Sequence, residues 1–112
     1  MESILVLIAG APGSGKAADA LKLAAAIRAQ GNGVSVFLVQ DAVLCAVREG
    51  DTEAHRLLQR VASDGVTFFC LAEDLAMRGH GPDDLLAQVQ PSDYGHLVDL
   101  MTGQFDRVIG VL

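Results

Sequence analysis

The chain has 112 residues, enough for one compact domain, to which we assign residues 1–112. Its 14 acidic residues outnumber its 8 basic ones, which gives a formal net charge of −6 without any cluster of Lys or Arg. This balance argues against nucleic acid and anionic membranes as partners, because both select basic surfaces.

The apolar runs of the chain are too short to span a membrane. The longest, Ile4–Ala9 and Val34–Val39, fall far below the roughly 20 residues that a membrane helix needs. The start of the chain, Met1–Ser3, lacks the basic residues of a signal peptide. We therefore expect a cytoplasmic protein whose two cysteines, Cys45 and Cys70, stay reduced.

Apolar segments of strand length alternate with segments whose apolar residues recur at helical spacing. The continuous run Ser3–Ala9 is typical of a central parallel strand that is covered on both faces. In chain order, the predicted elements are a strand at Ser3–Ala9, a helix at Ala17–Ala29, a strand at Val34–Val39, a short helix at Ala42–Glu49 capped by Asp41, a helix at Thr52–Ser63, a strand at Val66–Leu71, a helix at Ala72–Arg78, a helix at Asp83–Val89 with a strand near Leu86–Val89 as the alternative, a helix at Ser92–Met101 opened by Pro91, and a strand at Asp106–Val111. This order predicts a single three-layer α/β domain with a mostly parallel sheet of four or five strands flanked by helices.

The stretch GAPGSGKA, residues Gly10–Ala17, differs at one position from a nucleotide-binding P-loop. It matches that pattern at Gly10, Gly15 and Lys16, but Ala17 stands where a Ser or Thr hydroxyl would bind magnesium. We expect a structural glycine turn without ATPase activity. An anion site formed by Gly13, Gly15 and Lys16 remains the weaker alternative, because helix N-termini attract anions.

Cys70 lies at the carboxyl end of the predicted strand VTFFCL, at the edge where parallel sheets form their sites. The N-terminus of the following helix, together with Arg78 and His80, would favour a thiolate. The neighbouring phenylalanines and the acidic pair Glu73-Asp74 oppose it. We expect the positive groups to prevail, so that Cys70 is more reactive than Cys45. The alternative is a buried, inert cysteine.

The remaining polar residues indicate no metal or cofactor. Cys45 and Cys70 form no Cys-x-x-Cys pair, and no His/Asp/Glu cluster has metal-ligand spacing. Cys45 is either a second reactive thiol or a core residue packed near Val43 and Val47. We expect His55 to be solvated and His96 to be a partly buried, hydrogen-bonded imidazole.

Three segments, QDAVLCA, GVTFFCLAEDLAMRG and DRVIGVL, give the chain a likeness to a known family. Together with the glycine turn and the Ala-rich helix, they resemble the DsrE/TusD-type (DsrE/DsrF-like) sulfur-relay proteins over nearly the whole length. The resemblance implies that Cys70 carries sulfur as a persulfide between a donor protein and an acceptor protein. It also implies a homo-oligomer, or a hetero-oligomer with related subunits.

The resemblance leaves other functions open, because some relatives lack the cysteine and serve as structural subunits. The first alternative is a non-catalytic oligomeric binding module with the same fold, and the second is an anion- or nucleotide-binding protein that uses Gly10–Lys16. The high apolar content, 51%, independently favours burial between subunits in so small a domain. The helix Ser92–Met101 and the last strand are the candidate interface.

Overall fold

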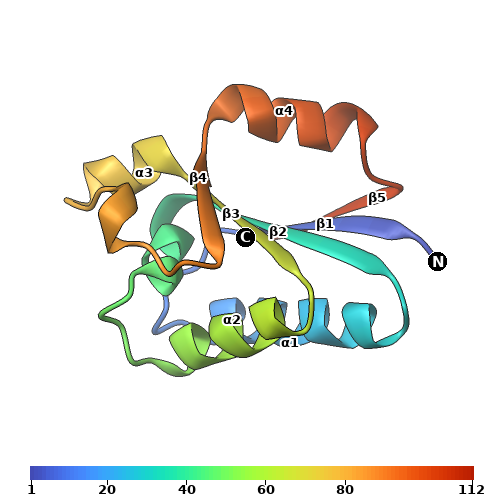
Figure 1. Ribbon diagram of the computed structural model, residues 1–112, viewed down its shortest axis with the longest axis horizontal. Helices are drawn as coiled ribbons and strands as arrows, with labels where there is room; N and C mark the ends of the chain where they lie inside the picture. The colour runs from blue at the N-terminus through green and yellow to red at the C-terminus, as the bar shows by residue number, and fades with distance from the viewer.

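The computed structural model describes residues 1–112 as one α/β domain around a five-stranded parallel sheet. The strands lie in the order β4-β3-β2-β1-β5 (Figure 1). They are β1 (Ser3–Ile8), β2 (Gly33–Leu38), β3 (Thr67–Leu71), β4 (Val89–Ser92) and β5 (Arg107–Val111). The helices are α1 (Gly15–Ala29), α2 (Glu53–Ser63), α3 (Ala72–Met77) and α4 (Tyr94–Gly103), with 3-10 turns η1 (Gln40–Ala46) and η2 (Pro82–Asp84).

The helices form layers on both faces of the sheet, as the sequence predicts. Helices α1 and α2 cover one face, and α4 lies over the other (Figure 1). Since β4 and β5 are the two edge strands, the α4 connection has to cross the sheet from one edge to the other. The predicted three-layer α/β fold is thereby confirmed.

Strand side chains point alternately to the two faces and fill two separate cores. The larger core, on the α1/α2 side, contains 25 buried residues, among them Val6, Val36 and Phe68. The smaller core, on the α4 side, contains Leu5, Phe37, Leu71, Leu97 and Leu100. The α4 layer is therefore the thinner of the two.

Helix α2 begins with a capping box that uses a histidine. Thr52 Oγ1 accepts the His55 backbone N–H, while the His55 ring accepts the Thr52 backbone N–H through Nδ1 at 3.3 Å. The His55 Nε2 donates to the Leu44 carbonyl at 2.8 Å, which ties α2 to η1. His55 is buried, so the expectation of a solvated side chain is wrong.

The segment between α3 and α4 differs most from the sequence prediction. Residues 83–89 form no α-helix, because Leu85 instead pairs with Val47 in an isolated antiparallel bridge and Leu86 donates to the Ala46 carbonyl. The strand that the sequence offered as an alternative near Leu86–Val89 is present as β4, but it lies later, at Val89–Ser92. Pro91 belongs to this strand, which tolerates proline because β4 is an edge.

The helices on either side of these strands also begin elsewhere than expected. Asp93 caps α4 through the His96 N–H, so α4 starts after the predicted Pro91-Ser92. The segment predicted as a helix at Ala42–Glu49 is a 3-10 turn that begins at Gln40, and Asp41 makes no capping hydrogen bond there.

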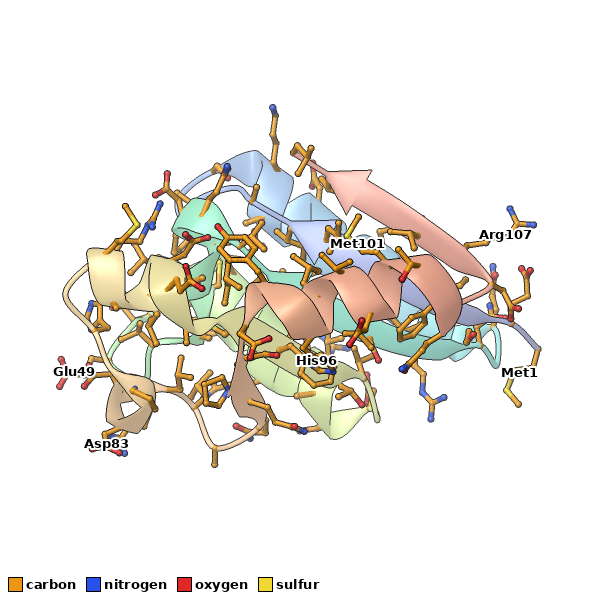
Figure 2. The ribbon with its side chains drawn as sticks, turned by 90° about the horizontal axis from the view of Figure 1, so that it is seen from above. Met1, Glu49, Asp83, His96, Met101 and Arg107 are labelled. Carbon is orange, nitrogen blue, oxygen red and sulfur yellow. The ribbon has the colours of Figure 1, made fainter.

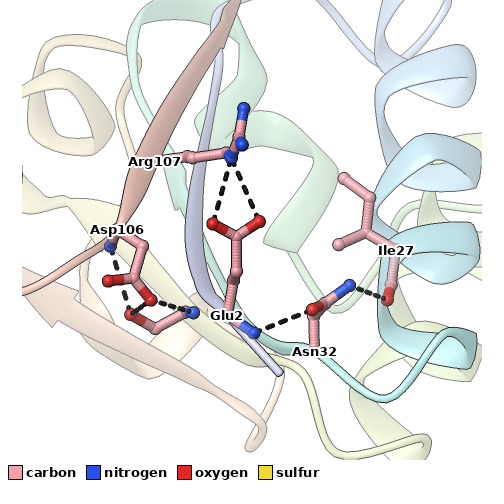
Figure 3. A network of polar contacts seen from close by, with 6 residues as sticks. Glu2, Ile27, Asn32, Asp106 and Arg107 are labelled. Carbon is pink, nitrogen blue, oxygen red and sulfur yellow. Dashed lines mark hydrogen bonds and ion pairs between the residues drawn. The ribbon is translucent and has the colours of Figure 1, made fainter.

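A polar network fastens the edge strand β5 at the amino end of the sheet (Figure 3). The Asp106 carboxylate accepts the Ser3 N–H at 2.9 Å, and Arg107 pairs with Glu2 at 3.1 Å. Asn32 joins the same network, since its side chain accepts the Glu2 N–H and donates to the Ile27 carbonyl. Polar contacts thus close the amino end of the sheet.

None of the helices is long and apolar enough to cross a lipid bilayer.

The close contact between Gly50 and the His55 ring provides a test of this packing. A Cβ atom at Gly50 would lie 1.7 Å from His55 Nε2, whereas one at Gly81 would meet nothing within 4 Å. We expect Gly50→Ala to lower the free energy of unfolding by about 1–3 kcal/mol, because the hydrogen-bonded ring has little room to move. Urea unfolding measures this, with Gly81→Ala as the matched control. Equal stability of the two variants would contradict the packing described.

Candidate functional site

Cys70 is the penultimate residue of β3, a strand paired on both sides. Its partners in register are Leu38 of β2 and Pro91 of β4. The alternation of the strand sends Phe68 and Cys70 into the larger core, while Leu71 enters the smaller core. The Cys70 side chain is fully buried as a result.

Two short elements, η1 and α3, close over this end of the sheet. Both contact β3, and they also contact each other. The larger core around Cys70 includes Val43, Cys45 and Ala46 from η1, and Leu75 from α3. The thiol lies behind these elements, and its nearest polar partner is the Leu71 carbonyl, 4.0 Å from Sγ.

The surroundings of Cys70 disfavour a thiolate. Burial and, to a smaller extent, the nearby Asp74 carboxylate raise the pKa of the Cys70 thiol from 9.0 to about 12. The expectation that positive groups lower the pKa of Cys70 is therefore wrong, because burial and a neighbouring carboxylate both raise it.

The two predicted supporting residues do not contact Cys70. Arg78 binds Asp41, with Nη2 2.9 Å from Oδ1, and its Nη1 donates to the Asp74 carbonyl. His80 Nδ1 lies 3.3 Å from Asp84 Oδ2. The Gly81 N–H and the His80 ring lower the pKa of Asp84. Arg78 and His80 are thus both engaged by carboxylates rather than by the thiol.

His80 lines a small cavity of about 310 Å³ between the segments that follow η1 and α3. Its lining residues are Val47, Arg48, Glu49, His80 and Asp84. Side chains of both charges line the cavity. Its two sides are joined by a hydrogen bond from the Arg48 N–H to the Asp84 carbonyl. The lining of the cavity therefore favours neither an anionic nor a cationic ligand.

Asp74 is the polar residue of the site that sequence reasoning undervalued. It is buried, and its Oδ2 accepts the Gln40 backbone N–H at 2.6 Å. Gln40 has a φ of 50°, in the left-handed region that side chains other than glycine rarely adopt. The four-residue spacing of Asp74 and Arg78 was the available signal, because residues at this spacing share one side of a helix.

Cys45, the second candidate thiol, lies in the same core as Cys70. Both cysteines are free and buried. Burial raises the pKa of the Cys45 thiol from 9.0 to about 12, against an opposing backbone hydrogen bond. Val43 and Val47 belong to the same core cluster, as the alternative of a packed cysteine expected.

The glycine loop after β1 is held by its own hydrogen bonds. The Ser14 hydroxyl donates to the Ala11 carbonyl and accepts the Ala17 N–H, so it caps α1. Ala17 is fully buried, whereas Lys16 is exposed and forms no ion pair. The loop therefore orders the start of α1, whatever it binds.

The other residues singled out in the sequence form no metal centre. No group of three or more His, Cys, Asp or Glu side chains is arranged to hold a metal ion. His96 is half-buried, its Nδ1 bonds the Ser92 hydroxyl, and its ring meets the Phe69 ring edge-on at 4.9 Å. The prediction of a partly buried, satisfied imidazole is confirmed.

The five-stranded parallel sheet with helices on both faces defines a class of small three-layer α/β domains, and a comparison of the sequence with protein families shows which family within that class. The family model of the DsrE/DsrF-like family matches residues 2–110. The chain therefore belongs to the DsrE/DsrF-like family.

Two solved structures share this fold over their full length. The ychN protein from E. coli is 25% identical, with a TM-score of 0.88, and the match covers 98% of this chain and 99% of that one. MTH1491 from Methanobacterium thermoautotrophicum, a protein of unknown function, is 21% identical, with a TM-score of 0.76 and coverage of 98% and 99%. No curated protein matches the sequence.

The raised pKa values of the two thiols predict a loss of stability in alkali. Each thiol is held neutral in the folded chain and ionises more readily when the chain is unfolded. Its contribution to the free energy of unfolding is therefore complete below about pH 9 and is lost as the pH rises toward 12. We expect the free energy of unfolding to fall by up to about 1.4 kcal/mol per pH unit for each thiol in that range.

Urea unfolding of the chain and of Cys70→Ala and Cys45→Ala, at several pH values above 8, measures this dependence. Each variant should show a shallower pH dependence than the parent chain, whatever its absolute stability. An unchanged slope in both variants would show that the thiols are not protected from ionisation.

Proposed function

We propose that this protein is a sulfurtransferase of the relay type, in which Cys70 carries the sulfur. The observation that carries the proposal is the place of Cys70: the end of β3, at the carboxyl edge of the sheet, in a chain whose family match spans residues 2–110. Sites in parallel α/β sheets form at this edge. The family resemblance supplies the persulfide chemistry.

The transfer needs one thiol and no cofactor. The Cys70 thiolate attacks the outer sulfur of a donor protein's persulfide, the donor's sulfur–sulfur bond breaks, and the donor cysteine leaves as a thiolate that takes the proton lost by Cys70. Cys70 then holds a persulfide, and an acceptor cysteine removes the outer sulfur by the same attack. No net oxidation occurs, because one persulfide replaces another.

The proposal assigns the protein to the cytoplasm and to protein partners. Thiolate attack requires reduced cysteines, which the cytosol maintains, and both cysteines of the chain are free. The net charge of −6 opposes nucleic acid. The expected partners are a sulfur donor, a sulfur acceptor and other subunits of this fold.

Substitution of each cysteine tests the assignment. After incubation with a persulfide donor, the parent chain should gain the mass of one sulfur atom on the peptide that contains Cys70. Cys70→Ser should abolish the gain while the fold is kept, and Cys45→Ser should retain most of it. Intact and peptide mass spectrometry measure the adduct. Loading that survives in Cys70→Ser and disappears in Cys45→Ser would assign the carrier role to the other thiol.

One observation favours a second function, a non-catalytic oligomeric module. The Cys70 side chain has no exposed surface, and a permanently closed thiol would be a core residue. Failure of both cysteines to accept sulfur, in a chain that assembles normally, would support this alternative over the relay.

The proposed assembly uses the outer side of α4. Three large apolar side chains at helical spacing on α4 are exposed: Tyr94 (49%), Val98 (53%) and Met101 (43%). Val108 of the following strand, β5, is 38% exposed. Figure 2 shows α4 lying across the sheet with Met101 on it. Large apolar side chains on the outer face of a thin layer are typical of surfaces that pack against another subunit.

Light scattering tests this surface with a matched pair of variants. The parent chain should be larger than an 11.7 kDa monomer at micromolar concentration. Val98→Asp should dissociate it, because a carboxylate cannot be buried unpaired at low cost. Leu23→Asp also replaces an apolar side chain by a carboxylate, at a 39% exposed residue of α1, and it should leave the assembly intact. A monomeric parent chain, or dissociation by Leu23→Asp alone, would contradict the proposed interface.

A further inference from the structure

We propose that α3 is a latch that covers Cys70 and opens to admit the sulfur donor, held shut by Asp74 and Arg78. The inference rests on the proposed relay function, because a carrier thiol has to be reached. The latch is defined as the two contacts that α3 makes with the β2–η1 junction: Asp74 with the Gln40 N–H, and Arg78 with Asp41.

The two latch contacts span the length of α3. Near its start, the buried Asp74 carboxylate accepts the Gln40 N–H at 2.6 Å, a short bond of the kind that charged acceptors form. Just past its end, Arg78 donates to Asp41 through Nε at 3.0 Å and through Nη2 at 2.9 Å. Between them, Leu75 packs into the core that contains Cys70. Removal of α3 therefore removes one wall around the thiol.

Of the two elements that cover Cys70, α3 is the one free to move. The second half of the turn η1 is fixed from other sides, since His55 of α2 donates to the Leu44 carbonyl and the Leu86 N–H donates to the Ala46 carbonyl. Helix α3 has six residues, has no side-chain cap at its N-terminus, and is followed by Gly79 with a φ of 83°. Apart from β3, its main contacts are with η1.

The backbone at Gln40 makes the closed latch easier to open. Its φ of 50° is unfavourable for a residue with a side chain. Because Asp74 holds the Gln40 N–H in place, departure of α3 lets this residue relax to an ordinary conformation. The strain is thus present in the closed state only, and it lowers the free energy needed to expose Cys70.

Thiol labelling of the full chain with iodoacetamide tests the latch without any sulfur donor. The label on Cys70 and on Cys45 is read separately by peptide mass spectrometry, under conditions where the rate follows the open population. Arg78→Gln should speed labelling of Cys70 by about two- to fivefold, the range expected for a partly exposed ion pair. Asp74→Ala should speed it by about tenfold, since it removes a buried charged acceptor.

For Gln40→Gly we expect slower labelling of Cys70, the opposite of the other two variants, which makes this variant the sharpest control. Glycine adopts the left-handed conformation freely, so opening releases no strain and Cys70 should label about threefold or more slowly than in the parent chain. In every variant Cys45, which lies in the anchored second half of η1, should label at the parent rate. Should Asp74→Ala fail to fold, Arg78→Gln and Gln40→Gly still predict changes of opposite sign.

Two results would overturn the latch. One is an equal change in the labelling of Cys70 and Cys45, which indicates global unfolding; the other is an unchanged Cys70 rate in Arg78→Gln and Gln40→Gly. Failure of the relay function is distinguishable, because it would leave these labelling rates as predicted while Cys70 accepts no sulfur from a persulfide donor.

Discussion

The alternation of side chains along β3 decides the chemistry available to this protein. With β2 and β4 paired on either side, the strand cannot rotate, and the residue two positions beyond Phe68 has to enter the same core. Cys70 is that residue. A thiol placed at the carboxyl edge is accordingly turned inward, where desolvation keeps it protonated. Any reaction at Cys70 therefore depends on the elements that close that edge, η1 and α3.

The sheet order imposes a second constraint, on the opposite face. Because β4 and β5 are the two edges, one helix has to cover the whole α4 side, and the smaller core holds only five buried residues. The outer side of α4 keeps apolar side chains exposed, and a neighbouring subunit would complete the layer. The proposed relay thiol thus faces the α1/α2 core, whereas the proposed interface lies on the outer side of α4.

The sequence predicted the local patterns well and the tertiary contacts poorly. The apolar runs of β1 to β3 and the place of Cys70 at a strand end follow from hydrophobic pattern and topology, and both are found. Pro91 led to the wrong prediction of a helix start, because proline is common both at helix starts and in edge strands. Only the order of strands in the sheet shows that Pro91 lies in an edge strand. Arg78 was expected beside the thiol, but it pairs with Asp41, a residue 37 positions away, which no local pattern reveals. Burial of Asp74 is a tertiary result of the same kind.

The central claim, that Cys70 becomes reachable by local opening of α3, is tested most directly by native-state amide hydrogen exchange. The exchange of α3 and of β1 is followed peptide by peptide in increasing, sub-denaturing urea. Our account predicts that the amides of Ala72–Met77 exchange with a much lower opening free energy than those of Ser3–Ile8, and with little dependence on urea, as a local fluctuation does. Exchange of α3 and β1 with the same opening free energy and the same urea dependence would show that Cys70 is exposed only when the whole domain unfolds.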